Sequence, residues 1–190
     1  MKWNQFIELI CSELQHGDKL ADFGVAFEDE HSLTRAISLG IRDLFTDTFR
    51  NQFDPSMISH HVVYRQGDTP QDKEAWNRNQ SDKWIRFHGV RFVPDILIRR
   101  QLNNVEDILP VEVKFIKKSG AAQGVATAIG QAMIYGMRYP RTIVFIGIDG
   151  GVRSAKYNLE ETAGVEEKQF NERLEQRGIH FILRKIGPLT

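Results

Sequence analysis

The sequence predicts an α/β layered fold, on three observations. Short apolar runs alternate with segments of helical apolar spacing, in the order helix, strand, strand, strand, helix, strand, helix, strand after an N-terminal helix. The run from Arg141 to Asp149 is continuously apolar, which is typical of a strand covered on both faces. The 190 residues, 41% of them hydrophobic and 26% charged, suffice for one substantial core, so we expect a single domain over residues 1–190.

Two amphipathic helices open the chain. Residues 2–15 place apolar side chains at helical spacing, and Gly17 follows as a stop signal. Residues 28–45 form a second predicted helix that begins with acidic residues. Its apolar stripe faces the core and consists of Leu33, Ala36, Ile37, Ile41, Leu44 and Phe45.

Three strands follow, interrupted by a long polar segment. Residues 57–65 predict the first strand, and residues 67–89 are polar, as expected of a functional or mobile insertion. Residues 96–98 and 111–115 predict the next two strands. Beyond them we expect a helix over 120–139 ended by Pro140, a strand over 141–149, a helix over 166–177 stopped by Gly178, and a strand over 179–184.

Charged side chains interrupt the two central apolar runs. Asp95 stands at the entrance of one strand, and in the other strand Glu112 and Lys114 share one face. If these strands pair antiparallel in a suitable register, Asp95 lies beside Glu112. Close carboxylates repel unless a proton or cation lies between them, and Mg²⁺ typically takes one or two protein carboxylates. The pattern therefore indicates a metal site.

These residues carry a family resemblance. Pro94-Asp95 followed by Glu112-Val113-Lys114 is similar to the signature of the PD-(D/E)xK nuclease superfamily. Gln131 and Tyr135 stand four apart, on one face of a helix, and resemble the QxxxY motif of its RecB-like branch. The acidic start of the 28–45 helix resembles the family's helix-borne glutamate.

The resemblance implies a restriction-endonuclease-like three-layer α/β/α core around a central mixed sheet. It also implies hydrolysis of phosphodiester bonds in DNA with Mg²⁺ or Mn²⁺, held by Asp95, Glu112, the Val113 carbonyl and Glu30. Lys114 would position water and offset charge, while Gln131 and Tyr135 would orient Lys114 or the phosphate. Restriction, repair, recombination and defence against mobile DNA are all compatible contexts.

The helix-borne acid has two candidates. Glu30 precedes Leu33 by three residues and Ile37 by seven, so it lies near the edge of the buried stripe, whereas Glu28 lies about 160° away from Glu30 around the helix. We favour Glu30 and keep Glu28 second. Both residues would also complement the helix dipole without any catalytic role.

Charge is distributed unevenly along a chain whose net charge is zero. Residues 1–60 carry −5, residues 61–158 carry +6 and residues 159–190 carry −1, so the basic excess coincides with the candidate site. Aromatic residues Trp76, Trp84 and Phe87 lie among these cations and would either stack on bases or pin the segment onto the core. The predicted DNA-binding residues are Arg78, Lys83, Arg86, Arg91, Lys117 and Lys118.

Two alternatives to a nuclease stay open at this stage. One is a non-cleaving nucleic-acid-binding module of the same fold, and the other is a subunit that depends on a partner. A homodimer or an accessory protein is compatible with either. With no apolar run long enough to span a membrane, no secretion signal and Cys11 as the single cysteine, we expect a cytoplasmic protein.

Overall fold

The computed structural model describes residues 2–50, 61–65, 69–80, 84–102, 105–117, 121–149 and 164–188. Five strands form one sheet in the order β1-β4-β5-β6-β7. Their bounds are β1 His61–Arg65, β4 Ile96–Leu102, β5 Val105–Ile116, β6 Thr142–Asp149 and β7 Ile179–Ile186. Residues 57–60 of the predicted first strand lie outside the described residues.

The sheet is mixed because its two halves are connected differently. β1 pairs antiparallel with β4, and β4 pairs antiparallel with β5 through a short connection. β5, β6 and β7 are parallel, and each crossover between them contains a helix, as parallel strands require. The two pairing modes meet at β5, which is antiparallel to β4 and parallel to β6.

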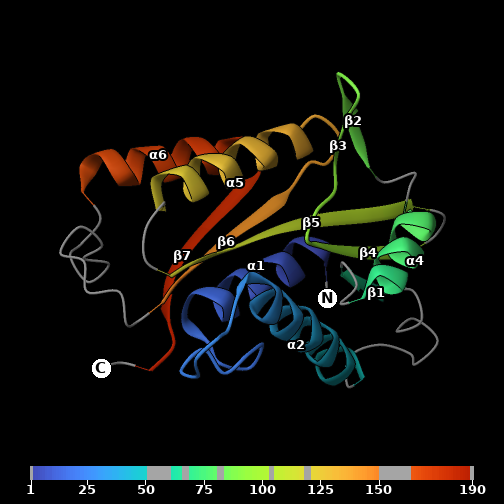
Figure 1. The fold of residues 1–190 in the computed structure, drawn as a ribbon, viewed down its shortest axis with the longest axis horizontal. Helices are drawn as coiled ribbons and strands as arrows, with labels where there is room; N and C mark the ends of the chain where they lie inside the picture. The colour runs from blue at the N-terminus through green and yellow to red at the C-terminus, as the bar shows by residue number, and fades with distance from the viewer. Residues whose placement is uncertain are drawn as a thin grey trace.

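Helices cover both faces of this sheet, which confirms the predicted three-layer α/β/α architecture (Figure 1). On one face α1 (Trp3–His16) and α2 (Glu30–Arg50) bury a core with Val111, Val113 and Phe145. On the other face α5 (Ala121–Tyr135) and α6 (Val165–Gln176) pack over the apolar residues Ile116, Val144 and Ile146. Alternate residues of β5 thus pack against the helices on opposite faces of the sheet.

Helix α2 begins two residues later than the sequence predicts, at Glu30 rather than Glu28. Asp29 is the cap, because its carboxylate accepts a hydrogen bond from the Ser32 N–H at 2.8 Å, and the Ser32 hydroxyl accepts one from the Asp29 N–H at 3.1 Å. Glu28 consequently lies outside the helix. The α5 helix also ends earlier than predicted, at Tyr135, where Gly136 follows, rather than at Pro140.

The polar segment before β4 contains a helix and a hairpin. α4 spans Pro70–Gln80, and β2 (Ile85–Phe87) pairs with β3 (Val90–Phe92) as a separate two-stranded ribbon. Trp76 and Trp84 are 6% and 8% exposed and pack with Leu97 of β4. Of the two alternatives for these tryptophans, stacking on bases or pinning the segment onto the core, the structure supports the second.

Within the described residues, no helix combines the length and the apolar character that a membrane span needs.

Candidate active site

The site forms where β4 enters the sheet beside β5. Ile96 pairs with Val111, so Asp95, one residue earlier, falls opposite Glu112, as the sequence predicts for an antiparallel pair in this register. Pro94 precedes Asp95 in the connection between β3 and β4. The Val113 N–H donates a hydrogen bond of 2.8 Å to Asp95 Oδ2, which fixes the carboxylate against the edge of β5.

The Lys114 ammonium lies at the centre of the acidic groups. Its Nζ is 2.9 Å from Glu112 Oε1 and 3.8 Å from Asp95 Oδ2. The same nitrogen lies 3.1 Å from Glu30 Oε1 and donates to the Val113 carbonyl oxygen at 3.2 Å. One cation therefore contacts all four of the groups that the sequence analysis selects as metal ligands.

The structure separates the two candidate acids of α2. Glu30 is the first residue of the helix, and its partly exposed side chain reaches Lys114. Glu28 instead contributes its backbone carbonyl, which accepts a hydrogen bond from the Lys117 ammonium. The geometry therefore favours Glu30 as the acid of this site.

Helix α5 supports Glu112 from the opposite layer. The fully buried Tyr135 hydroxyl donates a 3.0 Å hydrogen bond to Glu112 Oε2, and the Gln131 side chain hydrogen-bonds Tyr135. Spacing predicts that both residues share a helix face, and both do approach the site. Tyr135 contacts Glu112 and Gln131 contacts Tyr135, whereas the sequence analysis expects the two residues to orient Lys114 or the phosphate.

Burial dominates the electrostatics of the carboxyl pair. Desolvation raises the pKa of Asp95, although the Lys114 charge and the Val113 N–H oppose the rise. Desolvation, followed by the neighbouring Asp95 charge, raises the pKa of Glu112 to about 8. At neutral pH Glu112 therefore holds a proton that an exposed carboxyl would have lost.

The pKa values of Lys114 and Tyr135 are both raised, whereas a general base needs a lowered pKa. Burial alone lowers the pKa of Lys114, but the charges of Asp95, Glu112 and Glu30 outweigh it and the net shift is upward. Burial and the Glu112 charge raise the pKa of Tyr135. Both groups therefore keep their protons at physiological pH and act as donors.

The charge count of the cluster matches a divalent ion. Fully ionised, Glu30, Asp95 and Glu112 carry −3 against +1 on Lys114, leaving −2 in a largely buried site. Oxygen ligands from carboxylates and a carbonyl suit Mg²⁺ and Mn²⁺. Across the described residues, no group of three or more His, Cys, Asp or Glu side chains is spaced to hold a metal ion as the side chains stand. The Lys114 ammonium is the cation that the cluster surrounds.

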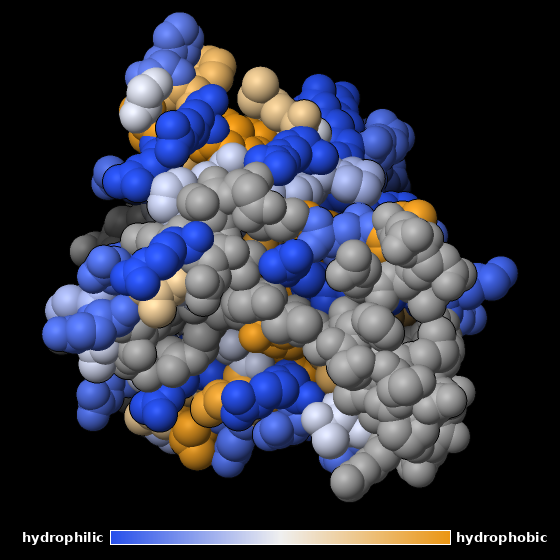
Figure 2. Space-filling model, turned by 90° about the vertical axis from the view of Figure 1, so that its right-hand side faces the viewer, coloured by the Kyte–Doolittle hydropathy of each residue, from blue (hydrophilic) through white to orange (hydrophobic). Residues whose placement is uncertain are grey.

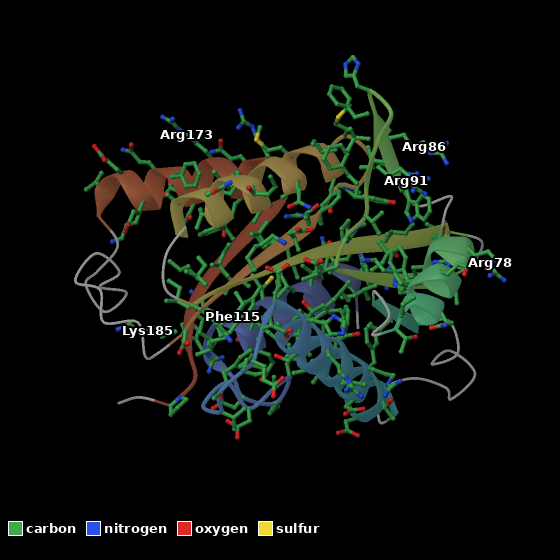
Figure 3. The ribbon with its side chains drawn as sticks, in the orientation of Figure 1. Arg78, Arg86, Arg91, Phe115, Arg173 and Lys185 are labelled. Atoms are coloured by element: carbon green, nitrogen blue, oxygen red, sulfur yellow. The ribbon has the colours of Figure 1, made fainter. Side chains whose placement is uncertain are left out.

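Of the six predicted DNA-binding residues, three arginines lie together on one side of the molecule, and Lys117 lies by Phe115 at the other end of β5 (Figure 3). Arg78 on α4 and Arg86 and Arg91 on the hairpin are exposed and project on the same side (Figure 3). Lys117 is exposed just beyond the end of β5, whereas Lys83 and Lys118 lie outside the described residues. Arg78 is also held by Glu74, one helical turn earlier, at 3.1 Å.

One feature of this region is absent from the sequence analysis. His88 and Gly89 form the tight turn of the β2–β3 hairpin, with φ of 47° and 80°. Positive φ at both central residues defines a type I′ turn. A histidine before glycine is a weaker turn signal than asparagine before glycine, so Gly89 is the main signal in the sequence for this turn.

No protein-family model and no curated protein sequence matches this chain. Among solved structures, the chain is similar to the restriction endonuclease BsaWI in a pre-specific complex with DNA. The TM-score is 0.31 and the identity 11%, over 62% of this chain and 39% of that chain. A likeness of this size does not assign the chain to a family, so the site is interpreted from its own geometry.

Proposed function

We propose that this protein is a metal-dependent nuclease that hydrolyses phosphodiester bonds in DNA. One observation carries the proposal: the Lys114 ammonium lies where two strand carboxylates, a backbone carbonyl and a helix carboxylate converge. Such a buried concentration of acid is costly for stability and is characteristic of a functional site.

Asp95, Glu112, the Val113 carbonyl and Glu30 would hold Mg²⁺ or Mn²⁺. With Glu30, Asp95 and Glu112 all ionised, the residual charge of −2 in the cluster would be cancelled by one such ion. When bound, the ion would polarise a phosphoryl oxygen and lower the pKa of a coordinated water.

Lys114 acts in this proposal as a positioning cation. Because its pKa is raised, the ammonium does not serve as a general base. It donates hydrogen bonds to the attacking water and offsets the negative charge that builds up on the phosphate in the transition state.

Tyr135 and Gln131 have a supporting role. By donating to Glu112 Oε2, Tyr135 fixes the carboxylate rotamer and leaves Oε1 facing Lys114. Gln131 in turn holds the phenol. Loss of either side chain should reduce activity less than loss of Asp95 or Lys114.

The test is cleavage of linear, circular and single-stranded DNA in Mg²⁺, Mn²⁺ or EDTA. Wild type is compared with Asp95→Asn and Lys114→Met, and with Glu172→Gln, an exposed acid on α6, as the matched control. We expect metal-dependent cutting that falls at least about 100-fold in the first two variants and is unchanged in the control. Equal cutting by Asp95→Asn and wild type would refute the site.

A non-cleaving or partner-dependent DNA-binding module is the second candidate. This candidate is favoured because the Lys114 ammonium contacts the acidic groups and offsets part of their negative charge without a metal ion. Salt-sensitive DNA binding by wild type without cutting in any metal would select this reading.

A further inference from the structure

The β2–β3 hairpin leaves the body of the molecule immediately before the candidate active site. Its two strands pair only with each other, and the ribbon projects beyond α5 and the sheet (Figure 1). Asp95 lies three positions after Phe92 at its base, a span of at most about 11 Å. The base of the ribbon is therefore close to the candidate active site.

Two arginines face each other across the ribbon. Arg86 pairs directly with Arg91, and opposed residues in antiparallel strands have Cβ atoms roughly 5 Å apart. Like charges at this spacing destabilise a hairpin. Both side chains are exposed, and the Arg91 guanidinium lies over the Trp84 ring at 4.9 Å.

The tip of the ribbon presents apolar surface to solvent. Phe87 and Val90, which flank the turn, are 46% and 55% exposed. The His88 ring lies edge-on to Phe87, with centroids 4.5 Å apart. Figure 2 views the molecule from the side that bears the arginines, and there apolar atoms show between mainly hydrophilic side chains.

We propose that this hairpin inserts into a groove of duplex DNA, where Arg86 and Arg91 contact phosphates or base edges and Phe87 packs against the bases. A two-stranded ribbon fits the major groove of B-form DNA, and residues 85–92 of the hairpin contain no acidic side chain, so a polyanion would supply opposite charge to the two opposed arginines. The inference rests on the proposed nuclease function and names the element that holds its substrate.

The geometry sets the reach of this contact. Three residues per strand add about 10 Å to the span from Asp95, so the tip lies within roughly 20 Å of the cleaved bond. At 3.4 Å per base pair this corresponds to about six base pairs. Duplexes that end closer than this on the hairpin side should bind more weakly.

The experiment measures binding of a labelled 30-base-pair DNA duplex, in EDTA, by the full chain. The test variants are Arg86→Gln with Arg91→Gln, and separately Phe87→Ala. Arg173→Gln is the matched control, because Arg173 is an exposed arginine on α6, away from the hairpin (Figure 3). We expect the double variant to bind at least about tenfold more weakly, and its salt slope to fall by about one for each arginine that contacts a phosphate.

Two further measurements separate groove insertion from general attraction. Phe87→Ala should weaken binding without changing the salt slope. Duplex RNA of the same sequence, whose deep major groove excludes such a ribbon, should bind equally to wild type and to Phe87→Ala. Arg86→Glu, which creates an ion pair with Arg91, should weaken DNA binding while its thermal midpoint stays at or above that of wild type.

The outcomes distinguish this inference from the proposed function. If wild type cuts DNA and the double variant binds and cuts equally well, the hairpin inference is wrong and the nuclease stands. Equal losses on DNA and RNA in Phe87→Ala would also overturn groove insertion. If wild type neither binds nor cuts DNA, both proposals fail.

Discussion

At the scale of single residues, the burial of Glu112 makes the stability of the metal-free protein depend on pH. Its carboxyl group is buried beside Asp95, and the pKa in the folded protein lies far above the ordinary value near 4.5. Between those two pKa values the folded chain binds more protons than the unfolded chain. Each rise in pH through this window therefore destabilises the metal-free protein.

The thermal midpoint of the metal-free protein should therefore depend on pH. We expect the thermal midpoint in EDTA to fall as pH rises from about 4.5 towards 8 and to flatten above 8, because Glu112 titrates with a raised pKa of about 8. Glu112→Gln removes the titrating group, so its midpoint should decline less and exceed that of wild type by at least about 3 °C at pH 8.

Scanning calorimetry at several pH values is the measurement, with Glu172→Gln as the exposed control. Lys114 does not contribute to the change of the thermal midpoint with pH, because its pKa is raised and it stays charged between pH 4.5 and 8. A wild-type midpoint that rises from pH 6 to pH 8 in EDTA would refute the buried, proton-binding pair.

At the scale of elements, the paired strands were the most predictable part of the site. The alternation of Glu112 and Lys114 with Val111 and Val113 predicts one polar face, and a short connection predicts antiparallel pairing, so only the register was open. The partner of Tyr135 was not predictable. A spacing of four residues places Gln131 and Tyr135 on one face of α5. Only the packing of α5 on the sheet decides that this face meets Glu112.

The start of α2 was only partly predictable. Acidic residues mark the beginning of a helix in general, yet the Asp29 to Ser32 capping contacts decide the actual first residue. Those contacts place Glu30 on the first turn and Glu28 before it, which separates two acids that look equivalent in the sequence.

This separation can be tested with a pair of variants. We expect Glu30→Gln to lower cleavage about tenfold and to raise the Mg²⁺ concentration needed for half-maximal rate, because Glu30 contacts Lys114 at the site. Glu28→Gln should stay within about twofold of wild type. Since acids near a helix N-terminus contribute only about 0.3–1 kcal/mol each, both variants should unfold at similar temperatures.

Rates and Mg²⁺ dependence measured side by side decide the matter. A larger effect of Glu28→Gln than of Glu30→Gln would show that the helix acid was assigned to the wrong residue.

At the scale of the whole molecule, the predicted layers and the order of the elements agree with the structure, whereas residues 67–89 were predicted only as a polar segment. α4 is polar almost throughout, and Trp76 anchors it by contact with Trp84 and Leu97, which no local pattern reveals. Charge distribution was more informative than net charge. The three predicted DNA-binding arginines, Arg78, Arg86 and Arg91, project on one side of a chain that is neutral overall (Figure 3).

If Lys114 stands among the ligands of a divalent ion, binding of Mn²⁺ depends on the carboxylates that surround it. Electron paramagnetic resonance of free Mn²⁺ counts bound ions without any need for activity. We predict about one Mn²⁺ bound per wild-type chain, tighter binding in Lys114→Met, where the competing ammonium is gone, and loss of binding in Asp95→Asn. Mn²⁺ binding that is absent in wild type, or equal in wild type and Asp95→Asn, would contradict the account.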